Sequence, residues 1–284
     1  MSSLKRKISR VIPAVDSQDG AGVQLKRSIG RNPSTRVDPF LMLDAFSSDN
    51  PDDYIAGFPP HPHRGFETVT YMLDGHMIHR DHMGNEGDLR AGGVQWMTAG
   101  HGVIHEERPQ MVEGLMRGFQ LWVNLPAKEK MKPAAYQNIE PEQVPEKRLA
   151  SGAIIKVIAG ELTIDDEPIQ GPISAPNTEP LYLDLQLPPG SKVELPIETT
   201  HNALVYLFDG QANIEGEALE HNAVNVLGQG NFVAINTDQT SARMLVLSGK
   251  PIGEPVAQYG PFVMNTMDEV EQAIQDYRSG RLTA

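Results

Sequence analysis

The chain has 284 residues, a formal net charge of −13 and no cysteine. Negative charge of this size repels phosphate backbones and argues against direct nucleic-acid binding, and the missing cysteine excludes disulfides and thiolate metal ligands. No apolar run approaches the ~18 residues of a membrane helix, and the basic N-terminus lacks the apolar segment of a secretory signal. We therefore expect a cytoplasmic, monomeric, globular protein that makes no membrane contact.

Near the N-terminus, Lys5, Arg6 and Lys7 form a short basic run, which we interpret as a solvated terminal cluster. Beyond it, short apolar runs alternate with frequent Gly and Pro, a pattern typical of many short strands joined by tight turns. This pattern predicts an all-β fold. The clearest strands are Thr68–Leu73, Gly93–Thr98, Gly118–Asn124, Ala153–Ile158, Leu181–Leu187, Ala203–Phe208 and Arg243–Leu247.

Two pairs of polar residues with i, i+2 spacing indicate a metal site. His61 and His63 form the first pair, and His105 and Glu107 form the second. Residues two apart on a strand point to the same face, so two neighbouring strands could aim all four side chains at one point. Imidazole nitrogen and carboxylate oxygen suit a first-row divalent ion.

The spacing leaves the identity of the acidic ligand open. Glu67 lies at i+4 from His63 and could share its face, whereas Glu106 follows His105 directly and should point away on a strand. The three-residue spacing of His76, His79 and His82 alternates between strand faces, so we expect a solvent-exposed hairpin there. His101 lies in a glycine turn and is expected to act locally, and Arg64 either orients Glu67 or lines the surface.

Composition and internal similarity predict two domains. Lys, Glu, Pro and Gln dominate between Lys128 and Gly152, so we predict an N-terminal domain at 1–130, a linker at 131–152 and a C-terminal domain at 153–284. Segment 67–75 aligns with segment 202–210 at an offset of 135, which indicates a duplicated β unit, and Gly93 then aligns with Gly228.

The same offset predicts that the second copy lacks a metal site. It places His61 on Pro196, His63 on Glu198, His105 on Thr240 and Glu107 on Ala242. Only the N-terminal half should then bind metal in this way.

One helix is predicted at the C-terminus. Thr266 and Glu269 form a capping box, an apolar stripe follows, and Gly280 occupies the position after the helix end. We expect this helix to pack against a sheet.

The histidine motifs resemble those of the cupin β-barrel. The first cupin motif is approximated by Gly57, His61, His63, Glu67 and Gly75 with altered gaps, and segment 100–105 keeps the G-x2-H core of the second motif without its Pro and Asn. Longer blocks resemble the pirin family more specifically, over nearly the whole chain. These blocks are Asp38–Asp44, His61–Val69, Gln95–Gly100, Leu121–Asn124 and Gly260–Thr266.

The resemblance implies two tandem cupin barrels with a short C-terminal helix and one metal ion in the N-terminal barrel. It implies His61, His63, His105 and Glu107 as ligands, which leaves Glu67 a supporting role. It also implies Fe(II) as the ion, with Ni, Cu, Zn and Mn as alternatives. Four protein ligands on an octahedral ion leave two positions open for substrate or O2.

The activity that the resemblance implies is quercetin 2,3-dioxygenase chemistry. A flavonol would be cleaved with O2, with release of carbon monoxide, and Glu107 would be the catalytic base that takes the enol proton. The alternative is a non-enzymatic, redox-sensing metal protein that regulates a transcription factor or a metabolic enzyme. Its acidic surface would suit a protein partner better than DNA.

Overall fold

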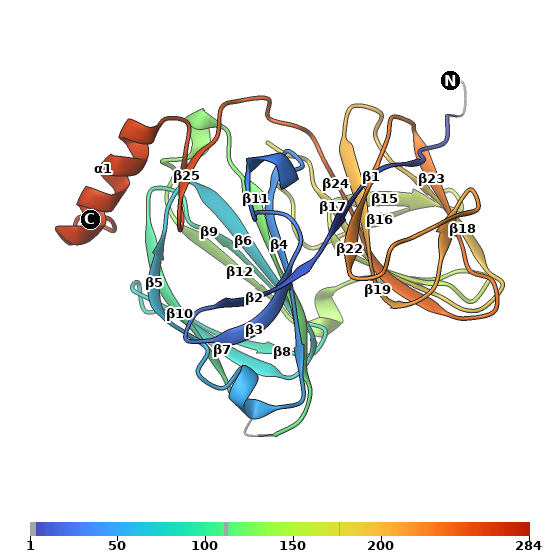
Figure 1. The fold of residues 1–284 in the computed structure, drawn as a ribbon, viewed down its shortest axis with the longest axis horizontal. Coiled ribbons are helices and arrows are strands. Elements are labelled where there is room, and N and C mark those ends of the chain that lie inside the picture. Colours follow the sequence, from blue (N-terminus) through green and yellow to red (C-terminus); the bar gives the residue numbers. More distant parts are fainter. Residues whose placement is uncertain (1–3, 111–112, 176) are drawn as a thin grey trace. The chain divides into compact units, whose positions relative to one another are not determined.

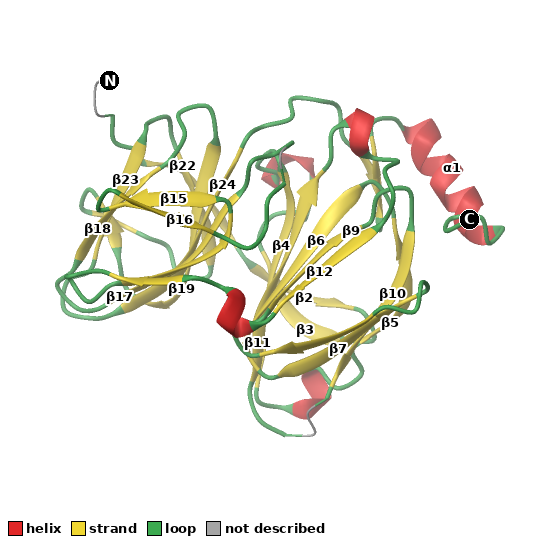
Figure 2. Cartoon of the chain, turned by 180° about the vertical axis from the view of Figure 1, so that it is seen from behind, coloured by secondary structure: helices red, strands yellow, loops and turns green. Residues whose placement is uncertain are grey.

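The described part of the chain is mostly β, as predicted, and includes one α-helix (Figure 1). The computed structural model describes residues 4–110, 113–175 and 177–284. Within this part of the chain, no helix is long and apolar enough to cross a membrane. Contacts divide the chain into two compact units, each built around a large sheet and a small sheet (Figure 2).

We call the first unit the N-terminal barrel; it comprises Asp16–Gly30, Phe40–Pro141 and Ile252–Ala284. Its seven-stranded sheet has the order β12 (Ala135–Ile139), β9 (Val94–Thr98), β6 (Phe66–Asp74), β11 (Met116–Asn124), β4 (Phe40–Ser48), β3 (Val23–Arg27), β2 (Val15–Asp19). Its four-stranded sheet has the order β5 (Phe58–His63), β10 (Val103–Pro109), β7 (His76–Asp81), β8 (Glu86–Arg90).

The second unit, the C-terminal barrel, comprises Met1–Val15, Arg31–Pro39 and Glu142–Pro251. Its seven-stranded sheet has the order β1 (Ile8–Pro13), β22 (Ala223–Leu227), β19 (Asn202–Gly210), β24 (Ala242–Gly249), β17 (Leu181–Leu187), β14 (Ile154–Ala159), β13 (Glu146–Arg148). Its four-stranded sheet has the order β18 (Lys192–Pro196), β23 (Phe232–Asn236), β20 (Asn213–Ile214), β21 (Glu217–Ala218). The hairpin of β15 (Glu161–Ile164) and β16 (Glu167–Gln170) completes this barrel.

The two barrels share one strand order in their sheets, apart from the edge strands β12 and β1, which come from different parts of the chain, and this shared order supports the predicted duplication. The offset of 135 relates β6 to β19, because Tyr71 and Tyr206 occupy the same place. It does not extend further: Tyr71 pairs with Val94 and Tyr206 pairs with Val224, so the next strands are offset by 130. The alignment of Gly93 with Gly228 was therefore wrong, because shorter turns in the second copy change the offset.

Both chain ends cross the predicted domain boundaries. Strand β1 pairs with β22 in the C-terminal barrel, although it lies within the first 130 residues. The segment after Pro251 belongs to the N-terminal barrel, where β25 (Ala257–Tyr259), β26 (Phe262–Met264) and α1 (Met267–Arg278) lie.

The predicted linker also contains regular structure. Strand β12 adds an edge to β9, and β13 adds an edge to β14, so each end of the linker extends one of the large sheets. The prolines still interrupt the segment, since Pro141 begins a short 3-10 helix that separates the two strands. Three further 3-10 helices lie at Pro33–Thr35, Pro51–Asp53 and Ala127–Glu129.

Helix α1 begins at the predicted capping box. The Thr266 hydroxyl accepts from the Glu269 backbone N–H, and the Glu269 carboxylate accepts from the Thr266 backbone N–H. Gly280 has a φ of 72°, the left-handed conformation that commonly ends a helix. Val270 and Ala273 are buried against Phe262 and Met264 of β26.

The basic run at residues 5–7 is not a solvated cluster throughout, because Arg6 is only 1% exposed. Its guanidinium donates to the backbone oxygens of Glu198, His201 and Gly228 in the C-terminal barrel. Lys5 and Lys7 are exposed, as predicted.

Candidate metal centre

The four predicted site residues lie on two neighbouring strands, as the spacing requires. His61 and His63 lie on β5, and His105 and Glu107 lie on the adjacent strand β10. His61 pairs directly with His105 across the ladder. Strand β5 can contain three prolines because it is the edge of its sheet and pairs with a neighbour on one side only. The pairing register shifts between His105 and Glu107, because β5 has one extra residue between Phe58 and His61.

The three histidines form one compact group. Their potential ligand nitrogens lie within 4.8 Å of one another, and their ring centroids are 4.3–4.8 Å apart. Nδ1 of His63 and Nε2 of His105 are buried and have no hydrogen-bond partner among the described residues. Buried polar atoms are rarely left unpaired in native proteins, so these two nitrogens fit a bound cation.

His61 is held in a form that suits metal binding. Its Nδ1 lies 2.8 Å from the carbonyl oxygen of Pro59 and therefore donates to it. With Nδ1 used in this contact, Nε2 is the ring nitrogen left to act as a ligand.

The electrostatics keep the buried imidazoles neutral. Burial lowers the pKa of His63 and of His105 well below the usual range, and neighbouring histidines lower both further. Burial also raises the pKa of Glu107, opposed by His61 and by hydrogen bonds from Gln120 and Thr70. Neutral imidazole is the form that binds metal, so the site is preset for a cation.

Glu107 falls in a second, overlapping group with His105 and His79, whose potential ligand atoms also lie within 4.8 Å of one another. The four predicted residues do not form one group with this spacing. Glu107 is 2% exposed and accepts long hydrogen bonds from Thr70 Oγ1 at 3.3 Å and from Gln120 Nε2 at 3.3 and 3.4 Å.

The expectation of a solvent-exposed histidine hairpin was wrong for His79. This residue is 2% exposed and pairs with Glu107 across the β7–β10 ladder. Its ring lies 4.6 Å from the ring of His105, and its Nε2 lies 2.9 Å from the Tyr136 hydroxyl. Burial lowers the pKa of His79 to about 4. The sequence did contain a signal for this burial: His79 lies two residues after the apolar Met77, and the two side chains share the buried face of β7.

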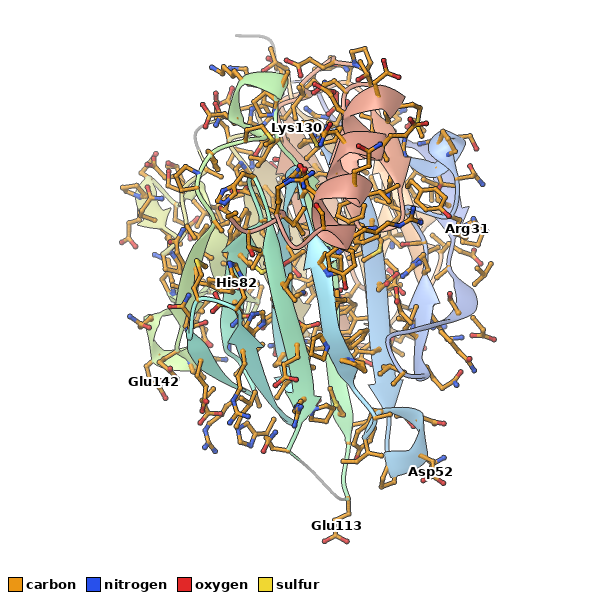
Figure 3. The ribbon with its side chains drawn as sticks, turned by 90° about the vertical axis from the view of Figure 1, so that its left-hand side faces the viewer. Arg31, Asp52, His82, Glu113, Lys130 and Glu142 are labelled. Atoms are coloured by element: carbon orange, nitrogen blue, oxygen red, sulfur yellow. The ribbon has the colours of Figure 1, made fainter. Side chains whose placement is uncertain are left out.

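The other two histidines of that hairpin behave as expected. His82 is exposed (Figure 3), and His76 is partly exposed and paired with Asp88.

The competing glutamates lie outside both groups. Glu67 accepts a hydrogen bond of 2.7 Å from Thr98 and one of 3.4 Å from Lys132. It alternates along β6 with Thr70, which faces Glu107, so its side chain leaves the opposite face of the sheet. Glu106 forms an ion pair with Arg108 and points away from the histidines, as strand alternation predicted.

Two buried cations fasten the turn after β5 to the C-terminal segment. Arg64 is 4% exposed, forms an ion pair of 2.8 Å with Asp276 of α1 and also donates to the backbone oxygen of His101. Neither predicted role of Arg64 holds, because its partners lie in other segments. Lys130, labelled in Figure 3, donates to the backbone oxygens of Gly65 and Val263 and to Asn124 Oδ1, at 2.8–3.0 Å.

This attachment leaves no room at Gly65, whose φ is 91°. A Cβ atom there would collide with the backbone oxygen of Val263 on β26. The ring of His101, in the neighbouring turn, lies 3.3 Å from the backbone oxygen of Lys132, so its contact reaches another segment and the expected local role was wrong.

The C-terminal barrel has no corresponding group of ligands among its described residues. The residues of β18 and β23 that face its core are aliphatic: Val193, Leu195, Val233 and Ile235. Pro196 and Glu198 are exposed and alternate with this inward face, so the offset of 135 gave the wrong counterparts for His61 and His63. The prediction that the second copy lacks the ligand set nevertheless agrees with this core.

Two barrels of this topology, with a histidine–carboxylate group that could hold a metal ion in one of them, define a bicupin. The profile of the Pirin family matches residues 22–123, and that of the Pirin C-terminal cupin domain matches residues 182–283. The chain belongs to the pirin family.

Individual relatives cover almost the whole chain. A protein of Pseudomonas aeruginosa named "Putative quercetin 2,3-dioxygenase" is 54% identical over 271 residues, which are 94% of each chain. One of Vibrio cholerae with the same designation is 44% identical over 276 residues, which are 97% of each chain. A crystal structure titled quercetin 2,3-dioxygenase from Acinetobacter baumannii has a TM-score of 0.90 and 34% identity, and the match covers 99% of each chain.

Proposed function

We propose that this protein is a metal-dependent dioxygenase that cleaves a flavonol such as quercetin, with one divalent ion held by His61, His63, His105 and Glu107. The observation that carries the proposal is the buried histidine group, in which two ring nitrogens have no hydrogen-bond partner among the described residues. The designations of the relatives supply the reaction type.

The chain's own residues explain how such a site would work. As ligands, the three imidazoles would supply nitrogen atoms without adding charge, and Glu107 would contribute one negative charge. Fe(II), or another first-row divalent ion, would act as a Lewis acid that stabilises the enolate of the substrate.

Glu107 is suited to be the base that takes the proton of the flavonol 3-hydroxyl. Its carboxylate lies in the group formed with His105 and His79, and burial raises its pKa, which strengthens it as a base. Proton transfer to Glu107 Oε and loss of the O–H bond leave the enolate, which then reacts with O2. Carbon monoxide and a ring-opened ester are the products.

The test is turnover of quercetin by Fe(II)-loaded protein, followed by loss of visible absorbance, O2 uptake and carbon monoxide release. The control is the double variant His61→Ala, His63→Ala, and His82→Ala serves as a matched exposed-histidine substitution. We expect turnover by the wild type and by His82→Ala only. Turnover by the wild type no faster than by the double variant would contradict the dioxygenase function.

A further inference from the structure

A row of polar side chains crosses the interior of the N-terminal barrel beneath Glu107. Its members are direct ladder partners on six adjacent strands, so their side chains lie on one face of the large sheet. We call them the interior polar row: Arg27, Asp44, Gln120, Thr70, Gln95 and Asn138.

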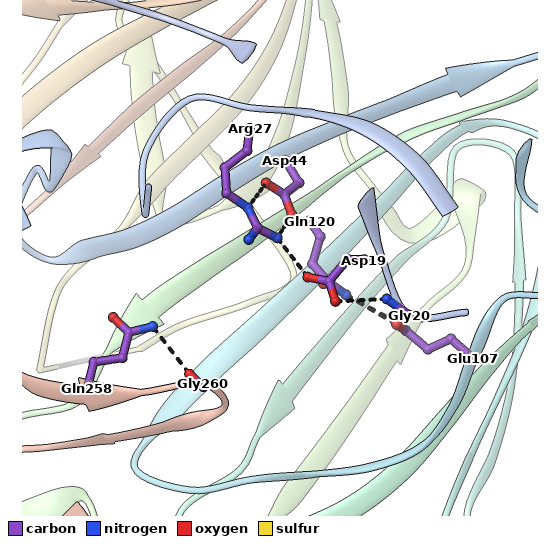
Figure 4. A network of polar contacts seen from close by, with 8 residues as sticks. All are labelled: Asp19, Gly20, Arg27, Asp44, Glu107, Gln120, Gln258 and Gly260. Atoms are coloured by element: carbon purple, nitrogen blue, oxygen red, sulfur yellow. Dashed lines mark hydrogen bonds and ion pairs between the residues drawn. The ribbon is translucent and has the colours of Figure 1, made fainter. Parts of the chain in front are cut away.

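Side-chain contacts join three pairs of neighbours within this row, of which Figure 4 shows Arg27 with Asp44. Arg27 binds Asp44 through two hydrogen bonds of 2.8 and 2.6 Å. Gln120 Nε2 lies 3.5 Å from Thr70 Oγ1, and Gln95 donates to Asn138 at 2.9 Å. Asp44, Thr70 and Gln120 of the row line a cavity of about 10 Å³ together with Glu107.

Residues of the four-stranded sheet lie opposite this row and leave space for its side chains. Glu107, His79 and Gly87 are ladder partners on β10, β7 and β8. A Cβ atom on Gly87 would lie 2.7 Å from Gln95 Nε2 and 2.8 Å from Asn138 Oδ1, so the amide pair fills the space above this glycine. The polar layer therefore continues from Glu107 across the barrel.

The C-terminal barrel shows that the fold does not need this row. The equivalent ladder partners there are Val157, Leu183, Val246, Val205 and Asn225. The four aliphatic residues belong to the hydrophobic core, and Asn225 donates to backbone oxygens near its own strand. Burying polar groups costs free energy unless they are hydrogen-bonded, so a polar row in only one of two matching barrels indicates a local task.

We propose that Gln120 and Thr70 are positioning residues, which orient the Glu107 carboxylate for metal binding. This inference rests on the proposed metal site. Gln120 donates to both carboxylate oxygens and Thr70 to one, so together they restrict rotation of the Glu107 side chain. Neither donor ionises near neutral pH, so the restraint does not depend on the protonation of the donors. Partners of this kind commonly change metal affinity 10–100-fold when removed.

The test is Ni²⁺ affinity, measured by titration calorimetry on the metal-free full-length protein. Thr70→Val keeps the side-chain shape and places the residue of the matching position, Val205, in the row. We expect Thr70→Val to weaken Ni²⁺ binding about 10-fold and Gln120→Leu about 10–100-fold, whereas Thr70→Ser keeps the hydroxyl and binds like the wild type.

The matched control is Thr98→Val, which removes a buried hydroxyl that donates to Glu67 instead. We expect its Ni²⁺ affinity to stay within twofold of the wild type. Thr70→Val decides the result if Gln120→Leu fails to fold. Affinities of Thr70→Val within twofold of the wild type, or equal losses in Thr70→Val and Thr98→Val, would overturn the proposal.

One further variant separates this inference from the proposed function. If His63→Ala abolishes Ni²⁺ binding while Thr70→Val and Gln120→Leu do not weaken it, only the positioning role fails. If His63→Ala binds Ni²⁺ like the wild type, the metal site itself fails. Neither result depends on turnover of a flavonol.

Discussion

Glu107 and Glu67, the two buried glutamates near the histidine pairs, have different surroundings. Glu107 is grouped with His105 and His79, and its pKa is raised by burial. Glu67 leaves the opposite face of β6 and binds Thr98 and Lys132. Burial alone therefore does not place a glutamate in a histidine group; the strand face from which its side chain projects does.

Substitution of each glutamate should separate their roles. We expect Glu107→Gln to lower kcat for quercetin about 10²–10⁴-fold, because the amide cannot accept the enol proton. Glu67→Gln should retain metal content and kcat, because its contacts lie on the other face of the sheet. Metal analysis and steady-state kinetics on both variants check this prediction, and equal losses of kcat would contradict it.

At the scale of elements, the C-terminal segment is part of the N-terminal barrel, and Lys130 is one of its main attachments. The three acceptors of its ammonium group belong to the turn after β5, the end of β11, and β26. The ammonium group has three donors, so all are used. Segments far apart in sequence are thereby joined beside His63.

Removal of this amine should destabilise the protein. Lys130→Met leaves three oxygens without their donor, and we expect the free energy of unfolding to fall by about 3 kcal/mol. Lys128→Met is the matched control, because Lys128 is exposed, and should change stability by less than about 0.5 kcal/mol. Urea denaturation of both variants checks the difference; similar values would show that the Lys130 contacts contribute little.

The same lysine predicts a pH dependence of stability. Burial lowers the pKa of Lys130 to about 8, from 10.5 in the unfolded chain. Between these values the unfolded state binds more protons than the folded state, so the free energy of unfolding should rise with pH. Denaturation of chelator-treated wild type and Lys130→Met at pH 8 and pH 10 isolates this effect. A wild type that gains no stability relative to the variant over this range would contradict the lowered pKa.

At the scale of the whole molecule, a duplicated topology carries two different interiors. The N-terminal barrel encloses histidines, Glu107 and the interior polar row, whereas the C-terminal barrel has an aliphatic core at the matching strands. The second barrel thus serves as an internal reference for what the fold alone requires.

This difference predicts one metal ion per chain. Metal analysis of the purified protein should give a ratio near one, and His63→Ala should reduce it to near zero, because the described residues of the C-terminal barrel include no second ligand group. A ratio of two would show that the C-terminal barrel also binds metal.

The sequence by itself determined the all-β class, the main strands, the capped helix and the face shared by His105 and Glu107. Those features follow from local periodicity and from capping chemistry, which act over a few residues. The resemblance of longer blocks, rather than periodicity, supplied the bicupin architecture and the expected ligand set.

Only the tertiary structure decided which distant residues meet. The burial of His79, the partners of Arg64 and Lys130, and the exchange of chain ends between the barrels depend on strand pairing across long separations. A fixed sequence offset also failed beyond β19, because turn lengths differ between the copies while the ladders match. The register between strands of the folded sheets therefore determines which residues form the interior polar row. No short sequence window contains this register.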